Sequence, residues 1–439
     1  MSSLQNKITA GDAVVTVVGM GYVGLPLALN FAKAGLQTFG LDIDVNKVET
    51  LNKGESYIEH IEAGRIAAVV DGGNFSATTD FACVAKSDAI VICVPTPLSK
   101  YHEPDLSYVV STVEAIVPHL KAGQLVSLES TTYPGTTDEE LLPRIEAQGL
   151  KVGEDCFLVF SPEREDPGNP DFTNTTIPKV IGGTTPACLV EGEALYNLVC
   201  DQVVPVSSTR AAEFTKLLEN IYRSVNIGLV NEMKIVAEAM NVDIWEVIQA
   251  AATKPFGFTP FYPGPGLGGH CIPIDPFYLT WKAKEYNIHT RFIELAGEIN
   301  ESMPQHVVHR VSDKLNEQSK AVRGSKVLVM GLAYKSNVDD VRESASFKLM
   351  DLLADSGAEV DYFDPHVDEV PPTREHARWT GQKSIEWNQQ NVSSYDCVLI
   401  ATSHDKYNLD ELVEWSDTII DTRNLLGTRE TKTGQVLKA

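Results

Sequence analysis

Residues 14–24 read VVTVVGMGYVG, and this stretch decides the fold of the first half of the chain. The β-branched run Val14 to Val18 has the composition of a buried strand, and Gly19, Gly21 and Gly24 follow it in the spacing G-x-G-x-x-G. The first glycine of such a turn permits a tight bend, the second lets a pyrophosphate approach the backbone, and the third lets helix and strand pack closely. The opening helix offers unpaired N–H groups to phosphates. The stretch therefore predicts a dinucleotide-binding turn.

An acidic residue, Asp42, stands at the end of the second expected strand, 18 residues after Gly24. A carboxylate at this place accepts a hydrogen bond from a ribose 2′-hydroxyl and repels a 2′-phosphate. The sequence therefore predicts NAD, rather than NADP, as the cofactor.

The spacing of apolar residues divides the chain into two α/β parts and a helical middle. Buried-strand patterns at 89–94, 125–128 and 157–160 alternate with amphipathic helices, which indicates a parallel sheet covered on both faces. Residues 208–240 form one long helical pattern, and a second α/β pattern begins at 326–330. We predict two Rossmann-like doubly wound α/β domains joined by a central helical domain with a long spine helix. The expected boundaries are 1–205, 206–316 and 317–439.

Composition narrows the possible partners and the compartment. The 439 residues include 36 basic and 60 acidic side chains, and a net charge of −24 argues against nucleic-acid binding. The seven cysteines contain no CxxC pair, which favours free thiols in a reducing compartment. With no apolar signal segment, and no run of about 18 apolar residues, we expect a cytoplasmic protein that does not span a membrane. We expect no metal site.

Several loops follow expected strands, at the edge where doubly wound sheets bind ligands. Thr96 lies in CVPTP, Ser130 and Thr131 lie in SLESTTYPG, and Glu163 lies in SPER. A carboxylate such as Glu163 beside a cofactor can orient water or accept a proton. Taken alone, each of these loops is also compatible with a simple turn.

The strongest chemical signal is the loop GPGLGGHCIPID at 264–275. Its glycines let backbone N–H groups surround an anion, and they lead directly to Cys271, with Asp275 four residues further on. A thiol with an ordinary pKa of about 8.5 is mostly protonated at neutral pH, so a nucleophilic Cys271 needs a base or a cation nearby. The candidates that the sequence offers are His270, Asp275, Lys216 and Asn220.

Two cations, Lys335 and Arg342, come soon after the first strand of the second α/β part, in YKSNVDDVRES. Their position at the carboxyl end of a strand in an acidic protein suits a nucleotide phosphate. A role as surface charges near a helix start remains an alternative.

These motifs together resemble the UDP-glucose/GDP-mannose dehydrogenase family from end to end. The resemblance rests on GMGYVGLPLA, VPTP, SPER, GGHCIPIDP, DVRES and the helix that carries Lys216 and Asn220. The longer runs SLESTTYPGTT and SPEREDPGNPDF are similar to a narrower bacterial group, which oxidises UDP-N-acetyl-D-glucosamine at C6 for O-antigen lipopolysaccharide synthesis.

The resemblance implies an N-terminal NAD domain, a central domain that forms a homodimer or a higher homo-oligomer, and a C-terminal domain that closes over a UDP-sugar. It also implies a four-electron reaction, in which the C6 alcohol becomes a carboxylate and two NAD molecules are reduced.

The resemblance further implies roles for individual residues. Cys271 would be the nucleophile, forming a thiohemiacetal and then a thioester, and Lys216 would stabilise the oxyanion. Asp275 and Asn220 would hold a catalytic water, Glu163 would assist thioester hydrolysis, and Thr131 would lie near the nicotinamide. The expected NAD contacts are Gly19, Gly21, Tyr22, Val23, Gly24, Asp42, Lys47, Thr96, Ser130, Thr131 and Arg342. The expected UDP-sugar contacts are Glu163, Lys216, Asn220, Tyr262, Gly264, Gly268 and Lys335.

Two departures from the glucose branch fit another sugar: Ile274 stands where that branch usually has Lys, and Pro167 stands where it has a second acid. UDP-N-acetyl-D-mannosamine and UDP-glucose remain alternative substrates. An isomerase that retains its NAD typically needs a Tyr-x-x-x-Lys pair, which Tyr196 and Tyr222 do not supply. A non-catalytic nucleotide-binding module is disfavoured because nucleophile, acid and lysine are all present.

Overall fold

The computed structural model describes residues 3–58, 61–99, 103–164, 175–269, 272–373 and 375–439. The chain forms two compact units, each described here by itself. The first unit comprises residues 1–219 and 277–289, and the second comprises residues 220–276 and 290–439. The long helix expected at 208–240 is α8 (Thr209–Ala239), whose sequence passes from the first unit into the second.

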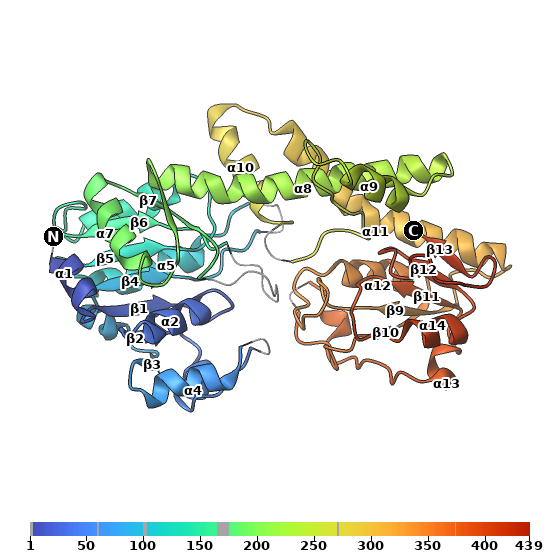
Figure 1. Cartoon of the computed structure of the whole chain (residues 1–439), viewed down its shortest axis with the longest axis horizontal. Coiled ribbons are helices and arrows are strands. Elements are labelled where there is room, and N and C mark those ends of the chain that lie inside the picture. Colours follow the sequence, from blue (N-terminus) through green and yellow to red (C-terminus); the bar gives the residue numbers. More distant parts are fainter. Residues whose placement is uncertain (1–2, 59–60, 100–102, 165–174, 270–271, 374) are drawn as a thin grey trace. The chain divides into compact units, whose positions relative to one another are not determined.

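The first unit is built on an eight-stranded sheet with the order β3-β2-β1-β4-β5-β6-β7-β8 (Figure 1). Its strands are β1 (Val14–Val18), β2 (Gln37–Leu41), β3 (Phe75–Thr78), β4 (Ala89–Ile92), β5 (Leu125–Leu128), β6 (Phe157–Phe160), β7 (Lys179–Gly183) and β8 (Val203–Val206). The first six follow the order 3-2-1-4-5-6 of a Rossmann sheet, which confirms the predicted fold class. The sheet is not wholly parallel, because β7 runs antiparallel to β6, and α7 then crosses over to place β8 parallel to β7.

Most helices of this unit fall between the strands, α1 precedes β1 and η4 follows β8. They are α1 (Ser3–Ala10), α2 (Gly24–Lys33), α3 (Val45–Asn52), α4 (Ala63–Asp71), α5 (Ser107–Ile116), α6 (Leu142–Glu146) and α7 (Pro186–Tyr196). Shorter helical turns are η1 (Phe81–Lys86), η2 (Val117–His119), the π-helical η3 (Thr137–Leu141) and η4 (Lys284–Tyr286).

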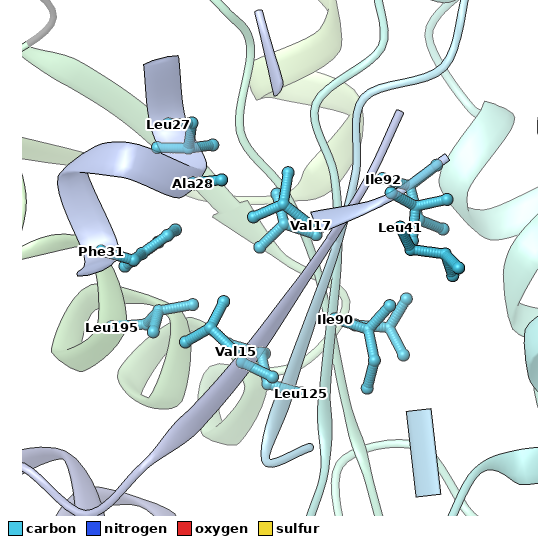
Figure 2. Close-up of a cluster of buried hydrophobic side chains, with 14 of the residues drawn as sticks. Val15, Val17, Leu27, Ala28, Phe31, Leu41, Ile90, Ile92, Leu125 and Leu195 are labelled. Atoms are coloured by element: carbon cyan, nitrogen blue, oxygen red, sulfur yellow. The ribbon is translucent and has the colours of Figure 1, made fainter. Parts of the chain in front are cut away.

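Both faces of the central strands are buried, as the continuous apolar runs predict. Figure 2 shows Val15 and Val17 of β1 on the same side as Leu27, Ala28 and Phe31 of α2. Ile90 and Ile92 of β4 point to the opposite face, since side chains alternate along a strand. This double burial fixes the position of the β1 carboxyl end, where the glycine turn begins.

The second unit contains a helical part and a parallel five-stranded sheet with the order β10-β9-β11-β12-β13 (Figure 1). This is the other common doubly wound order, 2-1-3-4-5, with its switch point between β9 and β11. The strands are β9 (Lys326–Met330), β10 (Glu359–Phe363), β11 (Cys397–Ile400), β12 (Ile419–Asp421) and β13 (Val436–Lys438). Its helices are α9 (Ile244–Ala252), α11 (Arg291–Glu317), α12 (Ala345–Asp355), α13 (Gln389–Val392) and α14 (Leu409–Trp415), with the turn η5 (Ala377–Trp379). The chain returns to the first unit within α10 (Asp275–Ala283).

Within the described ranges, no helix combines the length and the apolar character that a bilayer span requires.

Candidate active site

The glycine turn after β1 has the geometry that a dinucleotide requires. Gly19 has a φ of +92°, and a Cβ there would lie 2.6 Å from the Cys93 carbonyl oxygen. A Cβ on Gly24 would lie 1.9 Å from the Gly19 oxygen, so neither position accepts a larger residue. A Cβ on Gly21 would meet no atom within 4 Å, which leaves the backbone open to a pyrophosphate. Tyr22 and Val23, both half-buried, complete the turn, and the fit to NAD is therefore good.

Asp42 connects this turn to the end of β2. One of its carboxylate oxygens accepts from the Met20 N–H at 2.8 Å, and the other accepts from the Asp44 N–H at 2.9 Å. The Lys47 ammonium, on α3, lies 3.4 Å from the same carboxylate. Burial, together with Asp42 and Asp44, raises the pKa of the neighbouring Tyr57 well above its usual value. The predicted ribose-binding carboxylate is thus held rigidly beside the glycine turn.

Hydrogen bonds connect the loop after β4 to the loop after β5. The Ser130 hydroxyl donates to the Val94 carbonyl at 2.7 Å, and the Thr96 hydroxyl donates to the Thr131 carbonyl at 2.7 Å. The Tyr278 hydroxyl, from α10, donates to the Thr96 carbonyl at 2.6 Å. Three residues expected near the cofactor, Thr96, Ser130 and Thr131, therefore lie together at the carboxyl edge of the first sheet.

Glu163 and Lys216 form a second pair in the first unit. The Lys216 ammonium donates to the Glu163 carbonyl oxygen at 2.5 Å and lies 3.3 Å from its carboxylate. Lys216 is only 5% exposed, so its charge acts in a poorly solvated environment. The structure thus brings a fixed cation and a carboxylate together after β6.

A small cavity of about 30 Å³ adjoins Glu163 and is lined also by Glu129, Lys179 and Cys200. Lys179 lies 2.6 Å from the Glu129 carboxylate, and the Tyr196 hydroxyl donates to the same group. Burial raises the pKa of Glu129, and the Lys179 ammonium opposes this shift. The sequence pattern does not reveal this buried network, because its members come from three separate segments.

In the second unit, the Asn220 amide donates to the Asp275 carboxylate at 2.5 Å. Asp275 is 3% exposed and is the first residue of α10. The amide and the acid that the family resemblance associates with a catalytic water are therefore in contact. Cys271 and His270 lie outside the described residues, and so does Pro167.

The glycine loop that precedes Cys271 is anchored inside the second unit. The Gly264 N–H donates to the Asn231 side chain at 3.0 Å, and Asn231 donates to Asn300 at 2.9 Å. A Cβ on Gly268 would lie 2.8 Å from the Tyr334 Cβ, and Gly269 packs on the Tyr334 ring. The loop is therefore pressed against the residues that follow β9.

Arg423 is a further cation beside this loop. Its guanidinium donates to the Ala401 carbonyl at 2.8 Å, and a Cβ on Gly264 would lie 2.4 Å from it. Burial lowers the pKa of Arg423 to about 10. A cation directly after a strand was the signal that singled out Lys335, and the same signal after β12 would have found Arg423.

The remaining predicted contacts lie in the second unit. The Arg342 guanidinium contacts both oxygens of Asp340, at 2.6 Å from the nearer atom pair, and is partly exposed. Lys335 is half-buried after β9, and the Tyr262 ring stacks on Trp245 with a centroid separation of 5.7 Å. Among the residues described, no group of three or more His, Cys, Asp and Glu side chains could hold a metal ion.

Three domains of one known family match most of the chain. Residues 13–200 match the NAD binding domain of the UDP-glucose/GDP-mannose dehydrogenase family, residues 210–302 match its central domain, and residues 328–428 match its UDP binding domain.

Individual relatives cover nearly the whole length. The chain is 34% identical over 398 residues to the UDP-N-acetyl-D-glucosamine 6-dehydrogenase of Pseudomonas aeruginosa, across 90% of this chain and 92% of the relative. It is 33% identical over 411 residues to the UDP-N-acetyl-D-mannosamine dehydrogenase of Escherichia coli K12, across 90% and 95%. Among solved structures, the UDP-D-ManNAc dehydrogenase of Pyrococcus horikoshii superposes with a TM-score of 0.86 at 30% identity, covering 96% of this chain and 98% of that one.

Proposed function

The chain belongs to the UDP-glucose/GDP-mannose dehydrogenase family, and from this premise we propose that it oxidises the C6 hydroxyl of UDP-N-acetyl-D-glucosamine to a carboxylate with two molecules of NAD. The protein is an NAD-dependent UDP-sugar dehydrogenase, an oxidoreductase acting on CH–OH, and it contains the family's UDP binding domain. The observation that supports the choice of sugar is the 34% identity to the Pseudomonas aeruginosa enzyme over 90% of the chain.

In the proposed reaction, NAD held by the glycine turn and Asp42 would supply the hydride acceptor for both oxidations of C6. The Cys271 thiolate adds to the aldehyde carbon after the first oxidation, giving a thiohemiacetal that the second oxidation converts into a thioester. Water then cleaves the carbon–sulfur bond, which yields the carboxylate and restores the thiol. Covalent capture prevents loss of the aldehyde between the two oxidations.

The two observed side-chain pairs suit the other steps. Lys216, buried against Glu163, would stabilise the negative charge that develops on the C6 oxygen. Glu163 would accept a proton from the water that attacks the thioester, and the Asn220–Asp275 pair would orient that water. Lys335 and Arg423 would hold the anionic part of the UDP-sugar.

The epimer UDP-N-acetyl-D-mannosamine is the second candidate, because relatives that act on it are 33% and 30% identical to this chain. A comparison of kcat/KM for the two epimers and for UDP-glucose decides between them. We expect the highest value for UDP-N-acetyl-D-glucosamine. A higher value for the mannosamine epimer would overturn the choice of sugar and leave the class of reaction intact.

The proposed role of Asp42 leads to a prediction for an Asp42→Asn variant. The KM for NAD should rise about tenfold to hundredfold, since a hydrogen bond to a charged group contributes about 1.5–3 kcal/mol. The relative activity with NADP should increase, because the charge that repels a 2′-phosphate is removed. Steady-state kinetics with both cofactors measure this, and Asp44→Asn, a charge removal at the N-cap of α3 next to Asp42, is the matched control. An unchanged preference for NAD in Asp42→Asn would contradict the assignment.

We also propose that the chain forms at least a homodimer through α8. Tyr222, Leu229, Met233 and Val236 are all more than a third exposed, and their spacing of seven, four and three residues puts them on one face of the helix. Phe292 and Leu295 of α11 add exposed apolar surface to the same unit. Exposed apolar stripes of this kind mark protein–protein contacts.

A Leu229→Glu variant should therefore lose its partner, because a carboxylate in an apolar interface is costly to bury. Light scattering on the eluting protein should give the mass of one chain for this variant and at least twice that mass for the unmodified protein. Val190→Glu, at an exposed apolar position on α7, is the control and should keep the larger mass. If Leu229→Glu also keeps the larger mass, the contact between subunits does not involve this face of α8.

We further propose that the product serves surface polysaccharide synthesis and that the protein acts in the cytoplasm. Support for a reducing compartment comes from six cysteines, Cys83, Cys93, Cys156, Cys188, Cys200 and Cys397, which are all free thiols in the described part of the chain.

A further inference from the structure

Glu213 is a buried acid that the proposed reaction does not use. It lies on α8 three residues before Lys216, so the two side chains leave the same face of the helix. Glu213 is 1% exposed, and its carboxylate accepts three hydrogen bonds from the turn that follows Thr131. The donors are the Gly135 N–H at 2.5 Å, the Thr137 N–H at 2.9 Å and the Thr137 hydroxyl at 2.8 Å.

The N-terminus of η3 is capped by a side chain that is distant in sequence, Glu213, and not by a residue next to it. Gly135 has a φ of +112°, and η3 starts at Thr137, where no side chain of the N-cap residue Thr136 accepts a hydrogen bond. The first N–H groups of a helix lack partners within it, and here a carboxylate from 76 residues away satisfies the Thr137 N–H. Charge-assisted bonds of this kind are stronger than neutral ones. The position of the turn is therefore set by α8.

Other charged contacts reach the same segment through acids that are less buried. Asp138 pairs with Arg210 at 3.1 Å, and both side chains are at least a quarter exposed, so solvent screens this pair. Glu139 is about a third exposed and pairs at 2.7 Å with Lys282 of α10, which is buried. Glu213 is the deeply buried one of these three acids.

We propose that Glu213 is a positioning residue, which holds the 130–137 turn at a fixed place relative to Lys216 and so sets the geometry of hydride transfer. This inference rests on the proposed function, because it assumes that Thr131 and Lys216 flank the reacting carbon. A displacement of about 1 Å in such an arrangement can cost up to about a hundredfold in rate.

Burial also makes Glu213 sensitive to pH, since it raises the pKa of this carboxyl to about 7. The surrounding charges are Asp138 and Glu139 on η3, Arg210 and Lys216 on α8, and Lys282 on α10. Protonation removes the negative charge from the carboxylate, so the hydrogen bonds from the N–H groups of the turn weaken below about pH 7. Because the folded pKa lies above the unfolded value of 4.5, falling pH favours the folded state at this group. The loss of positioning at acid pH is therefore local and does not require unfolding.

The test is Glu213→Gln, which keeps the shape but presents an NH₂ group to the turn. We expect kcat to fall about tenfold to hundredfold with little change in the KM for the UDP-sugar. In the unmodified protein we expect kcat to decrease as the pH falls through about 7. This decrease, the acidic limb of the kcat profile, should be absent from the Glu213→Gln variant. Hydrogen exchange followed by mass spectrometry should show faster exchange in the 130–141 peptide, a readout that does not depend on turnover. Asp138→Asn is the matched control and should keep the kcat and retain an acidic limb, moved to lower pH because the Asp138 charge helps to raise the pKa of Glu213.

A Glu213→Gln variant with unchanged kcat, unchanged acidic limb and unchanged exchange would overturn the inference. A variant that slows turnover but keeps the acidic limb would also overturn it, because that is the result of a merely structural role. Activity of the unmodified protein separates this inference from the proposed function. If the unmodified protein oxidises a UDP-sugar and Glu213→Gln has the same kcat, only the positioning role fails.

Discussion

A Cys271→Ala variant should form no uronate, with kcat for carboxylate production reduced by at least about a thousandfold, because the proposed covalent adduct of the aldehyde needs the Cys271 thiol. Binding of NAD should remain, since the glycine turn and Asp42 lie in the first unit, at a distance of more than 200 residues along the sequence. The measurement combines product analysis by mass spectrometry with titration of NAD against protein fluorescence.

The control for the loss of a thiol is Cys397→Ala. Cys397 is buried in β11, and burial raises the pKa of its thiol to about 12, so it stays protonated and unreactive at neutral pH. This variant should form uronate at the normal rate, with an effect confined to stability. Normal turnover in Cys271→Ala would remove the nucleophile from the mechanism, because the thioester could not form.

A Lys216→Met variant should lose about a hundredfold to a thousandfold in kcat. Removal of one preorganised donor to a developing oxyanion costs this much in other enzymes, and methionine fills a similar volume without the charge. The change should appear mainly in kcat and less in KM, since the proposed interaction strengthens only as negative charge develops on the C6 oxygen.

The matched control is Lys234→Met. Lys234 is the second lysine of α8, is 1% exposed and pairs with Glu238 at 2.8 Å. Its replacement removes an equally buried ammonium from the same helix, so it measures the general cost of losing a buried lysine. If the two variants lose activity to the same extent, Lys216 has no special role at the reacting carbon.

Much of the fold could be predicted from the sequence, because buried parallel strands have a simple pattern. The expected ranges 14–18, 125–128, 157–160 and 326–330 coincide with β1, β5, β6 and β9, and the helix expected at 208–240 is α8. β7 and β8 were not predicted. Lys179–Gly183 ends in two glycines and Val203–Val206 contains a proline, and both features weaken a strand signal.

The sites could be predicted only in part. The pairs Lys216–Glu163 and Asn220–Asp275 join residues that the motifs had already singled out, although their catalytic roles stay predictions. Glu213 could not be found in this way, because an acid in an amphipathic helix has the same pattern whether it faces solvent or a distant turn. Its partners lie 76 and 78 residues away, and only the folded chain reveals them.

The central claim, a four-electron oxidation through one covalent intermediate, is tested most directly by the stoichiometry of the reaction. A limiting amount of UDP-N-acetyl-D-glucosamine is incubated with excess NAD and the purified protein until absorbance at 340 nm stops rising. We predict two NADH per nucleotide sugar and a uronate as the product. One NADH per sugar, with an aldehyde or ketone as the product, would contradict the account.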